Sequence, residues 1–459
     1  MTETPEPVAL INVVGLTTEM LDDRMPRLRA LADSGTTRPL VPVLPAVTTS
    51  VQSSMLTGVL PESHGIVGNG WYERDQDEIR FWKQSNHLVQ AEKVWETARR
   101  RAPSLTVANC FWWYAMQAST DITITPRPMY PADGRKIPDI HTTPSDLRNQ
   151  LQSTLGQFPL FNFWGPTANI ASSQWIADSA RIVHDQYAPD LLMVYLPHLD
   201  YDLQRYGPMD PRCDHAMSEI DEVAGNLVDH LHKDGRRIII VSEYGIGPVQ
   251  DAVFPNQVLR QSGLLQTRDE LGHELLNPGG SVAFAVADHQ IAHVYVNDPE
   301  RQVEVAQLLE SVDGIASVLA DDAIQAAGLA HPRAGNLVLL AEKNRWFTWD
   351  YWLDDQRAPD FARTVDIHRK PGYDPRELFF APGWAGSKPR LALKLLAKKL
   401  GQRTIMDAVS LDTSRVGGSH GLVGPGSEGI LIQDHDDALP PSVPCTAVRD
   451  IVLNTLFGS

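Results

Sequence analysis

Residues 44–69 read LPAVTTSVQSSMLTGVLPESHGIVGN, and the rest of the chain is best placed relative to them. The stretch begins with an apolar loop that contains proline, continues through Thr48, Thr49 and Ser50, and then runs as a short segment to Gly58. This order predicts a loop that passes into a helix. Backbone N–H groups and the positive end of the helix dipole attract an anion such as phosphate, so a hydroxyl group at this junction is well placed for chemistry. A simpler interpretation is that one of the three hydroxyl residues caps the helix.

The composition is that of an ordinary globular protein. The chain has 459 residues, of which 42% are hydrophobic and 21% are charged. Its formal net charge of −17 argues against nucleic acid or an anionic membrane as the main partner, because both would be repelled. A small anionic substrate stays compatible, since a local metal or basic cluster can outweigh the global field.

Cysteine usage and the N-terminal residues favour a cytoplasmic protein. Cys110, Cys213 and Cys445 are far apart and form no CxxC motif, so we expect neither a disulfide framework nor a cysteine zinc site. The first residues, MTETPEPVALINVVGL, are acidic and lack the basic region of a signal peptide. Their apolar run, Val8–Leu16, is too short to span a membrane and is typical of a strand buried on both faces.

Strand and helix patterns alternate up to about residue 255. The predicted strands are Val8–Leu16, Leu105–Trp113, Leu191–Leu196 and Arg237–Ser242, and the predicted helices are Thr17–Ser34, Glu92–Arg101, Ser145–Leu155, Thr167–Tyr187 and Pro211–Lys233. This alternation predicts an α/β fold with a mostly parallel central sheet and helices on both faces. Ligands bind beyond the carboxyl ends of such strands, where Gly15, residues 198–202 and Glu243 fall. We therefore expect one composite site at that edge.

The pattern changes near residue 256. Two short strands around Asp288 and His289 predict a hairpin, and further short helices and a strand follow up to residue 341. We interpret residues 256–345 as a smaller α+β cap or insert, and residues 1–255 and 346–459 as the core. Farther on, the lysine-rich segment Leu391–Leu400 predicts a basic surface helix, and residues 417–421 form a glycine-rich loop.

The sequence of residues 44–69 resembles the nucleophile segment of the type I phosphodiesterase/nucleotide pyrophosphatase family, which belongs to the alkaline phosphatase superfamily. In that family a Thr or Ser precedes a helix that runs into the signature TG-x-x-P-E-x-H-G-I-x-x-N, which this chain carries from Thr57 to Asn69. The resemblance implies an alkaline phosphatase-like fold. Counting back from Thr57 puts Thr48 at the nucleophile position, and His64 within the signature takes a structural role.

The family's usual active site holds two divalent metals, commonly zinc, and the resemblance assigns their ligands position by position. Asp200, Glu243 and His420 stand at ligand positions and are residue types that bind metals. The departures are Val14 for Asp, Gln204 for His, Tyr244 for His and, at a position that often contacts phosphate, Val51 for Asn. Because valine cannot bind a metal and tyrosine and glutamine bind weakly, we do not expect the usual two-zinc site. The remaining set predicts a single divalent ion, zinc, manganese or magnesium, held by Asp200, Glu243 and His420.

Several further side chains are candidate substrate contacts. They are His198, Asp202, Gln204, Tyr244, His368 and Lys370. The first two follow a predicted strand, and the last two lie in the charged stretch Asp366–Pro375, which resembles a stretch found in bacterial members of the family. The alternative interpretation of both groups is a loop or turn with solvated charges. The aromatic run Phe111–Tyr114 fits either the core or a pocket wall.

The leading hypothesis is a hydrolase that cleaves a phosphoric (di)ester or pyrophosphate-type small molecule. Thr48 would attack phosphorus, and Glu243 would serve as a metal ligand or, without a metal, as the base that activates Thr48. The departures motivate two alternatives, a non-catalytic member that binds a metabolite or partner and a transferase that uses the same pocket. No nucleic-acid or membrane partner is expected, and the oligomeric state stays open.

Overall fold

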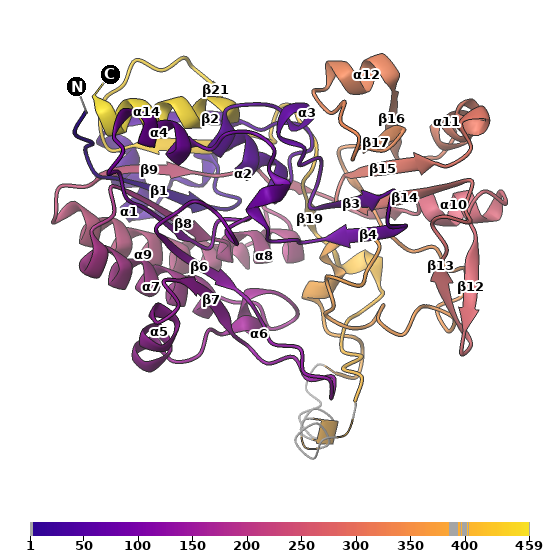
Figure 1. The fold of residues 1–459 in the computed structure, drawn as a ribbon. Coiled ribbons are helices and arrows are strands. Elements are labelled where there is room, and N and C mark those ends of the chain that lie inside the picture. The colour runs from indigo at the N-terminus through magenta and orange to yellow at the C-terminus, as the bar shows by residue number, and fades with distance from the viewer. Residues whose placement is uncertain (1–2, 385–392, 395, 397–401, 403, 459) are drawn as a thin grey trace.

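A nine-stranded sheet forms the centre of the computed structural model, which describes residues 3–384, 393–394, 396, 402 and 404–458 (Figure 1). Across the sheet the strands are β21 (Val443–Pro444), β2 (Thr36–Val41), β20 (Gly429–Gln433), β9 (Arg237–Val241), β1 (Val8–Val13), β8 (Leu191–Leu196), β5 (Val107–Cys110), β6 (Ile122–Pro126) and β7 (Ile140–Thr143). The strands from β9 to β6 are parallel, whereas β20 and β7 run antiparallel to their neighbours. The predicted α/β class and mostly parallel sheet are confirmed.

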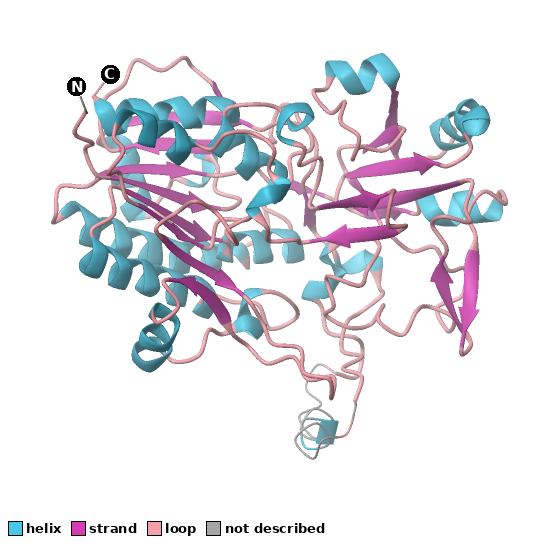
Figure 2. Cartoon of the chain, viewed as in Figure 1, coloured by secondary structure: helices cyan, strands magenta, loops and turns pink. Residues whose placement is uncertain are grey.

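Continuous apolar strands form the middle of this sheet because both of its faces are covered. All six residues of β1 and all six of β8 are buried, and the two strands pair in register from Val8 opposite Leu191. The helices α1 (Pro26–Asp33), α7 (Ala171–Tyr187) and α9 (Cys213–His232) pack together, and α2 (Thr48–Thr57), α4 (Val94–Arg101) and α14 (Val448–Phe457) form a second group. Figures 1 and 2 show these two groups on opposite faces of the sheet, as predicted.

Two local predictions are wrong. The segment Thr17–Ser34 is not one helix, since a 3-10 turn at Thr18–Met20 is followed by α1, which begins only at Pro26. Proline has no N–H and a fixed φ, so it begins a helix readily and cannot continue one. Neither Thr48 nor its two hydroxyl neighbours cap α2, because the extended residue Val47 takes the capping position and Thr48 is already helical.

A second, four-stranded sheet lies beside the first. Its strands, in order, are β14 (Ala283–Asp288), β15 (Ile291–Val296), β17 (Leu337–Ala341) and β16 (Ile315–Ala320), and α10 (Pro255–Gln261), α11 (Gln302–Glu310) and α12 (Asp321–Ala326) surround it. The predicted hairpin is confirmed, with His289 at positive φ in the turn. Its hydrophobic core also takes in Tyr72, Phe81 and Trp349 from outside residues 256–345. The cap bounds therefore stay a prediction.

Further helices and strands complete the described part of the chain. They are α3 (Pro61–His64), α5 (Leu147–Leu155), α6 (Leu160–Phe163), α8 (His198–Tyr206), β3 (Gly70–Glu73), β4 (Glu78–Phe81), β10 (Gly247–Pro248), β11 (Asp251–Val253), β12 (Thr267–Glu270), β13 (His273–Leu276), β18 (Arg345–Phe347) and β19 (Gly418–Ser419). All three cysteines are free and buried. The basic helix predicted at residues 391–400 falls almost entirely outside the described residues. Among the helices that the structure describes, none combines the length and apolar character needed to cross a bilayer.

Candidate active site

The Thr48 hydroxyl lies at the predicted edge of the central sheet. Thr48 is the first residue of α2 and is 6% exposed. Its Oγ1 lies 3.0 Å from the hydroxyl of Tyr244, which follows β9. Tyr244 in turn donates a longer hydrogen bond, 3.5 Å, to Oδ1 of Asp200 in α8. Tyr244 thus links Thr48, almost 200 residues away in the sequence, to the buried carboxyl group of Asp200.

The signature that ends at Asn69 folds back onto the start of α2. Gly58 ends the helix in the left-handed conformation, with φ of +74°, and lets the chain reverse. Asn69 Oδ1 then accepts a hydrogen bond of 3.1 Å from the N–H of Thr49. Asp288 of the second sheet holds Asn69 by accepting from its backbone N–H at 2.9 Å and from its amide at 3.1 Å. Burial raises the pKa of Asp288 to about 7, although the two hydrogen bonds from Asn69 lower it.

Glu243 is a fully buried carboxyl group beside the Thr48 hydroxyl. Its Oε1 accepts from Asn12 Nδ2 at 2.7 Å and from Gln52 Nε2 at 2.6 Å, whereas its Oε2 has no hydrogen-bond partner that meets normal geometry. Burial raises the pKa of Glu243 to about 8, although hydrogen bonds from Gln52, Asn12 and Thr48 lower it. A carboxyl group that titrates near neutral pH next to a hydroxyl group is suited to proton transfer.

Asp200 is the second buried carboxyl group of the site. The first turns of α8 place it after β8, and Gln204, one helical turn later, donates a 2.5 Å hydrogen bond to its Oδ2. Burial raises the pKa of Asp200 to about 7, against hydrogen bonds from Gln204 and Tyr244. Asp200 therefore exchanges its proton in the same pH range as Glu243.

The glycine-rich loop brings His420 against Tyr244. A Cβ at Gly418 would collide with the carbonyl oxygen of Leu203, so glycine allows the loop to press against α8. His420 Nδ1 lies 2.8 Å from the carbonyl oxygen of Ala46 and must donate to it, which leaves Nε2 with the lone pair. The rings of His420 and Tyr244 stack 3.8 Å apart, and burial lowers the pKa of His420 to about 3. His420 is thus a neutral ring that also fixes the orientation of Tyr244.

A cavity of about 1260 Å³ opens above these groups. Thr48, Asp200, Gln204, Tyr244 and His420 all line it. Its walls are mainly aromatic, and the rings are Trp82, Trp113, Tyr130, Phe161, Phe163, Trp164, Tyr195, Tyr201, Phe361, Tyr373, Phe380 and Trp384. Basic side chains at Arg127, Arg135, Lys136, His368 and Arg369 also line it. The cavity therefore offers ring surfaces and positive charge around the Thr48 hydroxyl.

The predicted substrate contacts divide into two groups. Gln204, Tyr244 and His368 line the cavity. The other three do not, because their side chains have partners elsewhere. His198 bonds to Glu219 at 3.0 Å, Asp202 pairs with Arg205 at 2.7 Å, and Lys370 forms a buried ion pair with Glu377.

Sequence reasoning missed several residues that shape the site. They are Asn12, Gln52, Asn69, Asp288 and His289. A polar Asn12 inside an otherwise apolar strand was a readable signal, since a buried amide needs a partner. Asp288 and His289 gave no such signal, because they reach the site through the packing of one sheet on another. The aromatic run predicted as core or pocket does both, with Trp112 buried and Trp113 on the cavity wall.

The residues at the family's metal positions do not fit a two-metal centre. Val14 is buried and apolar, Gln204 is bonded to Asp200, and the Tyr244 side chain contacts Thr48, Asp200 and His420. The predicted single-metal set does not converge either. Among the described residues, the one group of three or more His, Cys, Asp or Glu side chains close enough to hold a metal is His184, Asp185 and His230. None of these three lines the cavity.

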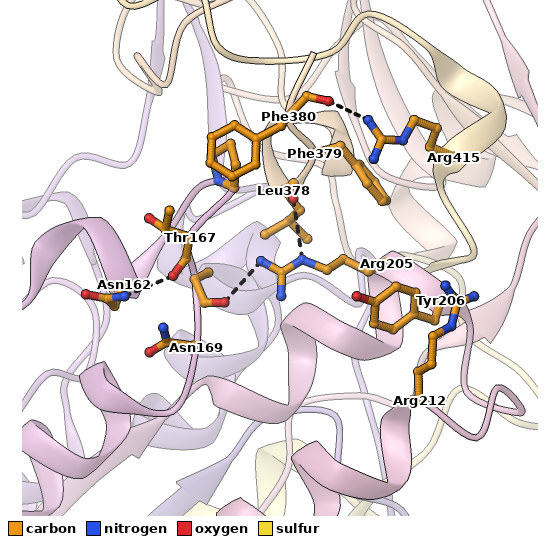
Figure 3. Close-up of a pocket in the computed structure, with 12 residues that line it drawn as sticks. Asn162, Thr167, Asn169, Arg205, Tyr206, Arg212, Leu378, Phe379, Phe380 and Arg415 are labelled. Carbon is orange, nitrogen blue, oxygen red and sulfur yellow. Dashed lines mark hydrogen bonds between the residues drawn. The ribbon is translucent and has the colours of Figure 1, made fainter. Parts of the chain in front are cut away.

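A second, smaller cavity of about 690 Å³ adjoins the first, and Pro166, Thr167 and Phe380 line both. Figure 3 shows three arginines around it. Arg205 donates to the carbonyl oxygens of Leu378 and Ala168, Arg415 donates to that of Phe380, and Arg212 lies over the Tyr206 ring. These guanidinium groups hold chain segments together beside the main cavity.

Solved structures share this fold at low identity. A phosphonoacetate hydrolase from Sinorhizobium meliloti, in complex with phosphonoformate, superposes with a TM-score of 0.63 and 15% identity, covering 99% of this chain and 100% of that one. Human ectonucleotide pyrophosphatase/phosphodiesterase 5 superposes with a TM-score of 0.60 and 13% identity, covering 98% and 95%. These likenesses establish an alkaline phosphatase-like fold.

Sequence relatives match part of the chain. An uncharacterised pyrophosphatase/phosphodiesterase of Schizosaccharomyces pombe is 26% identical over 237 residues, 49% of this chain and 41% of that protein. Human ectonucleotide pyrophosphatase/phosphodiesterase family member 1 is 24% identical over 274 residues, 56% of this chain and 25% of that protein. The matches thus span less than half the length of these relatives. The sequence model of one protein family matches residues 8–374, from β1 through the Thr48 segment to the cavity wall. This chain therefore belongs to the type I phosphodiesterase / nucleotide pyrophosphatase family.

Proposed function

We propose that this chain is a hydrolase that cleaves a phosphoric ester, diester or pyrophosphate-type small molecule with Thr48 as nucleophile. One observation carries the proposal. The Thr48 hydroxyl faces the large cavity and lies between Tyr244, at 3.0 Å, and the buried carboxyl group of Glu243. Family membership supports the reaction class, and the phosphonate in the S. meliloti structure supports a small substrate that carries phosphorus.

The proposed first step uses the two carboxyl groups as base and acid. Glu243 takes the proton of Thr48 as Oγ1 bonds to phosphorus and the bond to the leaving group breaks. Asp200, when protonated, donates along the same contact in the reverse direction, to the Tyr244 oxygen, and the Tyr244 hydroxyl passes its own proton to the departing oxygen. Water then attacks the phospho-threonine, with the proton transfers reversed. The pKa values of about 8 for Glu243 and about 7 for Asp200 support such exchange near neutral pH.

The cavity walls favour a substrate with an aromatic group next to the phosphorus. Trp82 lies 4.9 Å from Trp113 and 5.1 Å from Tyr373, ring centroid to centroid, and all three line the cavity. Flat rings bind on such surfaces by stacking. Arg127 and Lys136 on the cavity wall offer charge to the phosphoryl oxygens. We therefore expect aryl or heteroaryl esters to be better substrates than alkyl esters.

A Thr48→Ala variant tests the nucleophile. Turnover of an aryl phosphodiester that releases a coloured phenol should fall by at least about 10³-fold, because the covalent step is lost. Ser50→Ala is the matched control, since the Ser50 hydroxyl is buried two residues farther along α2 and has no hydrogen-bond partner. Full turnover by Thr48→Ala would remove Thr48 from the mechanism.

The replaced metal positions favour a second candidate, a member that binds a phosphorylated metabolite without turnover. Val14, Gln204 and Tyr244 are the observation behind it. Under this alternative, phosphonate or phosphate ligands would raise the melting temperature of wild type and Thr48→Ala equally, and neither would turn over any aryl ester. A transferase would instead give a phosphorylated alcohol when an acceptor alcohol is added, which product analysis detects.

A further inference from the structure

Three potential metal ligands meet on the side of the molecule that the cavity does not use. His184 lies in the last turn of α7, Asp185 follows it, and His230 lies in the last turn of α9. One ligand atom from each lies within 4.8 Å of the others. The two histidine rings stand edge to face with centroids 5.6 Å apart. The group therefore joins two helices that pack on the same face of the sheet.

The carboxylates around these rings already point at the imidazole nitrogens. His230 Nε2 lies 2.6 Å from Asp185 Oδ1, and His184 Nε2 lies 2.8 Å from Asp234 Oδ2. His184 is 4% exposed, and its Nδ1 is buried without a hydrogen-bond partner. A buried imidazole nitrogen without a partner costs free energy unless something else binds it or its ring reorients. The group is thus built from two adjacent His–Asp pairs with one buried ring nitrogen unused.

The local field favours a cation. The strands β8 and β9 are parallel, and α7 and α9 each precede one of them, so both helices end at the amino-terminal edge of the sheet. Helix C-termini carry partial negative charge that stabilises cations within the last turn. Asp185 and Asp234 add full negative charges there, in a chain whose net charge is −17.

We propose that His184, Asp185 and His230 bind a divalent transition metal of the zinc class, while Asp234 contacts the other ring nitrogen of His184 and holds that ring in place. Imidazole and carboxylate are ligands that zinc takes in tetrahedral sites, at about 2.0–2.2 Å. Ligand atoms around such an ion stand roughly 3.4 Å apart, so closing the group requires shifts of about 1 Å. The Asp185 side chain is more than half exposed, which leaves it free to move.

This metal would have a structural role. It would join the ends of α7 and α9 at the opposite edge of the sheet from Thr48. The length of a six-residue strand, about 20 Å, separates the two edges. The site is therefore independent of the proposed reaction, and its test does not depend on turnover.

The test measures zinc bound to the full chain after dialysis against micromolar zinc, by elemental analysis. Wild type should keep one zinc that His230→Ala and Asp185→Asn both lose. His232→Ala is the matched control, because that ring lies two residues farther along α9 and bonds to Asp434 at 3.0 Å instead. Asp200→Asn and His420→Ala control for metal at the cavity and should keep the zinc. A chelator should lower the melting temperature of wild type and leave that of His230→Ala unchanged.

Two results would overturn the proposal. One is zinc retained at full stoichiometry in both His230→Ala and Asp185→Asn. The other is zinc lost in Asp200→Asn or His420→Ala but kept in His230→Ala, which would move the ion to the cavity. Cobalt substitution gives a second readout, since a tetrahedral site yields strong visible absorption that His230→Ala should abolish and His232→Ala should retain. Circular dichroism confirms that each variant is folded.

Discussion

Replacing Glu243 by glutamine should make the protein more stable at alkaline pH while lowering the proposed turnover. The two side chains have the same shape, so Asn12 and Gln52 can donate to the carbonyl oxygen of the glutamine as they do to Glu243 Oε1. What changes is the charge. Glu243 is fully buried and has no cationic partner among its contacts, so its ionised form is disfavoured in the folded chain.

The pKa of Glu243 sets the size of the effect. Burial raises it from 4.5 to about 8. At about 1.36 kcal/mol per pH unit, this difference corresponds to a penalty on the order of 5 kcal/mol once the group is ionised. Between the two values the folded chain keeps a proton that the unfolded chain has released. Raising the pH from 4.5 to about 8 therefore lowers the free energy of unfolding of the wild type. Glutamine does not ionise and escapes this loss.

Urea unfolding of wild type and Glu243→Gln at several pH values between 4.5 and 9 is the assay. The stability of the variant relative to wild type should increase by several kcal/mol across the window and level off above pH 8. Glu310→Gln, on the exposed surface of α11, is the matched control and should track the wild type. A difference between Glu243→Gln and wild type that stays constant with pH would refute the assignment of a neutral, buried Glu243. Turnover should fall by about 10²–10⁴-fold, the usual contribution of a general base.

Three further outcomes are expected. The pH profile of turnover should be bell-shaped, because the reaction needs Glu243 without its proton and Asp200 with one. Their pKa values are about 8 and about 7. The falling limb of the profile should disappear in Asp200→Asn. Tyr244→Phe keeps the ring on His420 but loses the bond to Thr48, so kcat should fall about 10- to 100-fold, and steady-state kinetics showing an unchanged kcat would exclude the relay. Arg376→Met leaves the buried Asp350 and Asp374 unpaired and should cost about 3–5 kcal/mol of stability by urea unfolding, whereas loss of the exposed pair at Arg29 should cost less than about 1 kcal/mol.

Much of the core fold could be predicted from short-range patterns. The runs Val8–Val13 and Leu191–Leu196 are apolar at every position but Asn12 because both faces of the sheet are covered, and this pattern is visible in the sequence. The break at Pro26 was visible too, yet the helical spacing on both sides of it concealed the interruption. The antiparallel strand β20 gave no comparable signal, since its position between β9 and β2 depends on pairing across the whole chain.

The site could be located from sequence more readily than its chemistry. The sequence motif of residues 44–69 predicted Thr48 at the edge of the sheet, where its hydroxyl group contacts that of Tyr244. It could not show that Tyr244 would stack on His420, or that Glu243 would take two amide partners, because these contacts arise from tertiary packing. The same packing keeps His198 and Asp202 off the cavity wall, with Glu219 and Arg205 as partners, although their spacing after a strand resembled that of site residues.

The strand order has a consequence for synthesis on the ribosome. Strand β2, which leads into the Thr48 loop, pairs with β20 and β21, and both of these lie near the C-terminal end of the printed sequence. Translation delivers the N-terminal segments first. Until residues 429–444 emerge, β2 lacks its neighbours and Ala46 lacks the bonds from His420 and to Gly421. The site proposed around Thr48 would therefore stay incomplete in a nascent chain until residues 429–444 have been made.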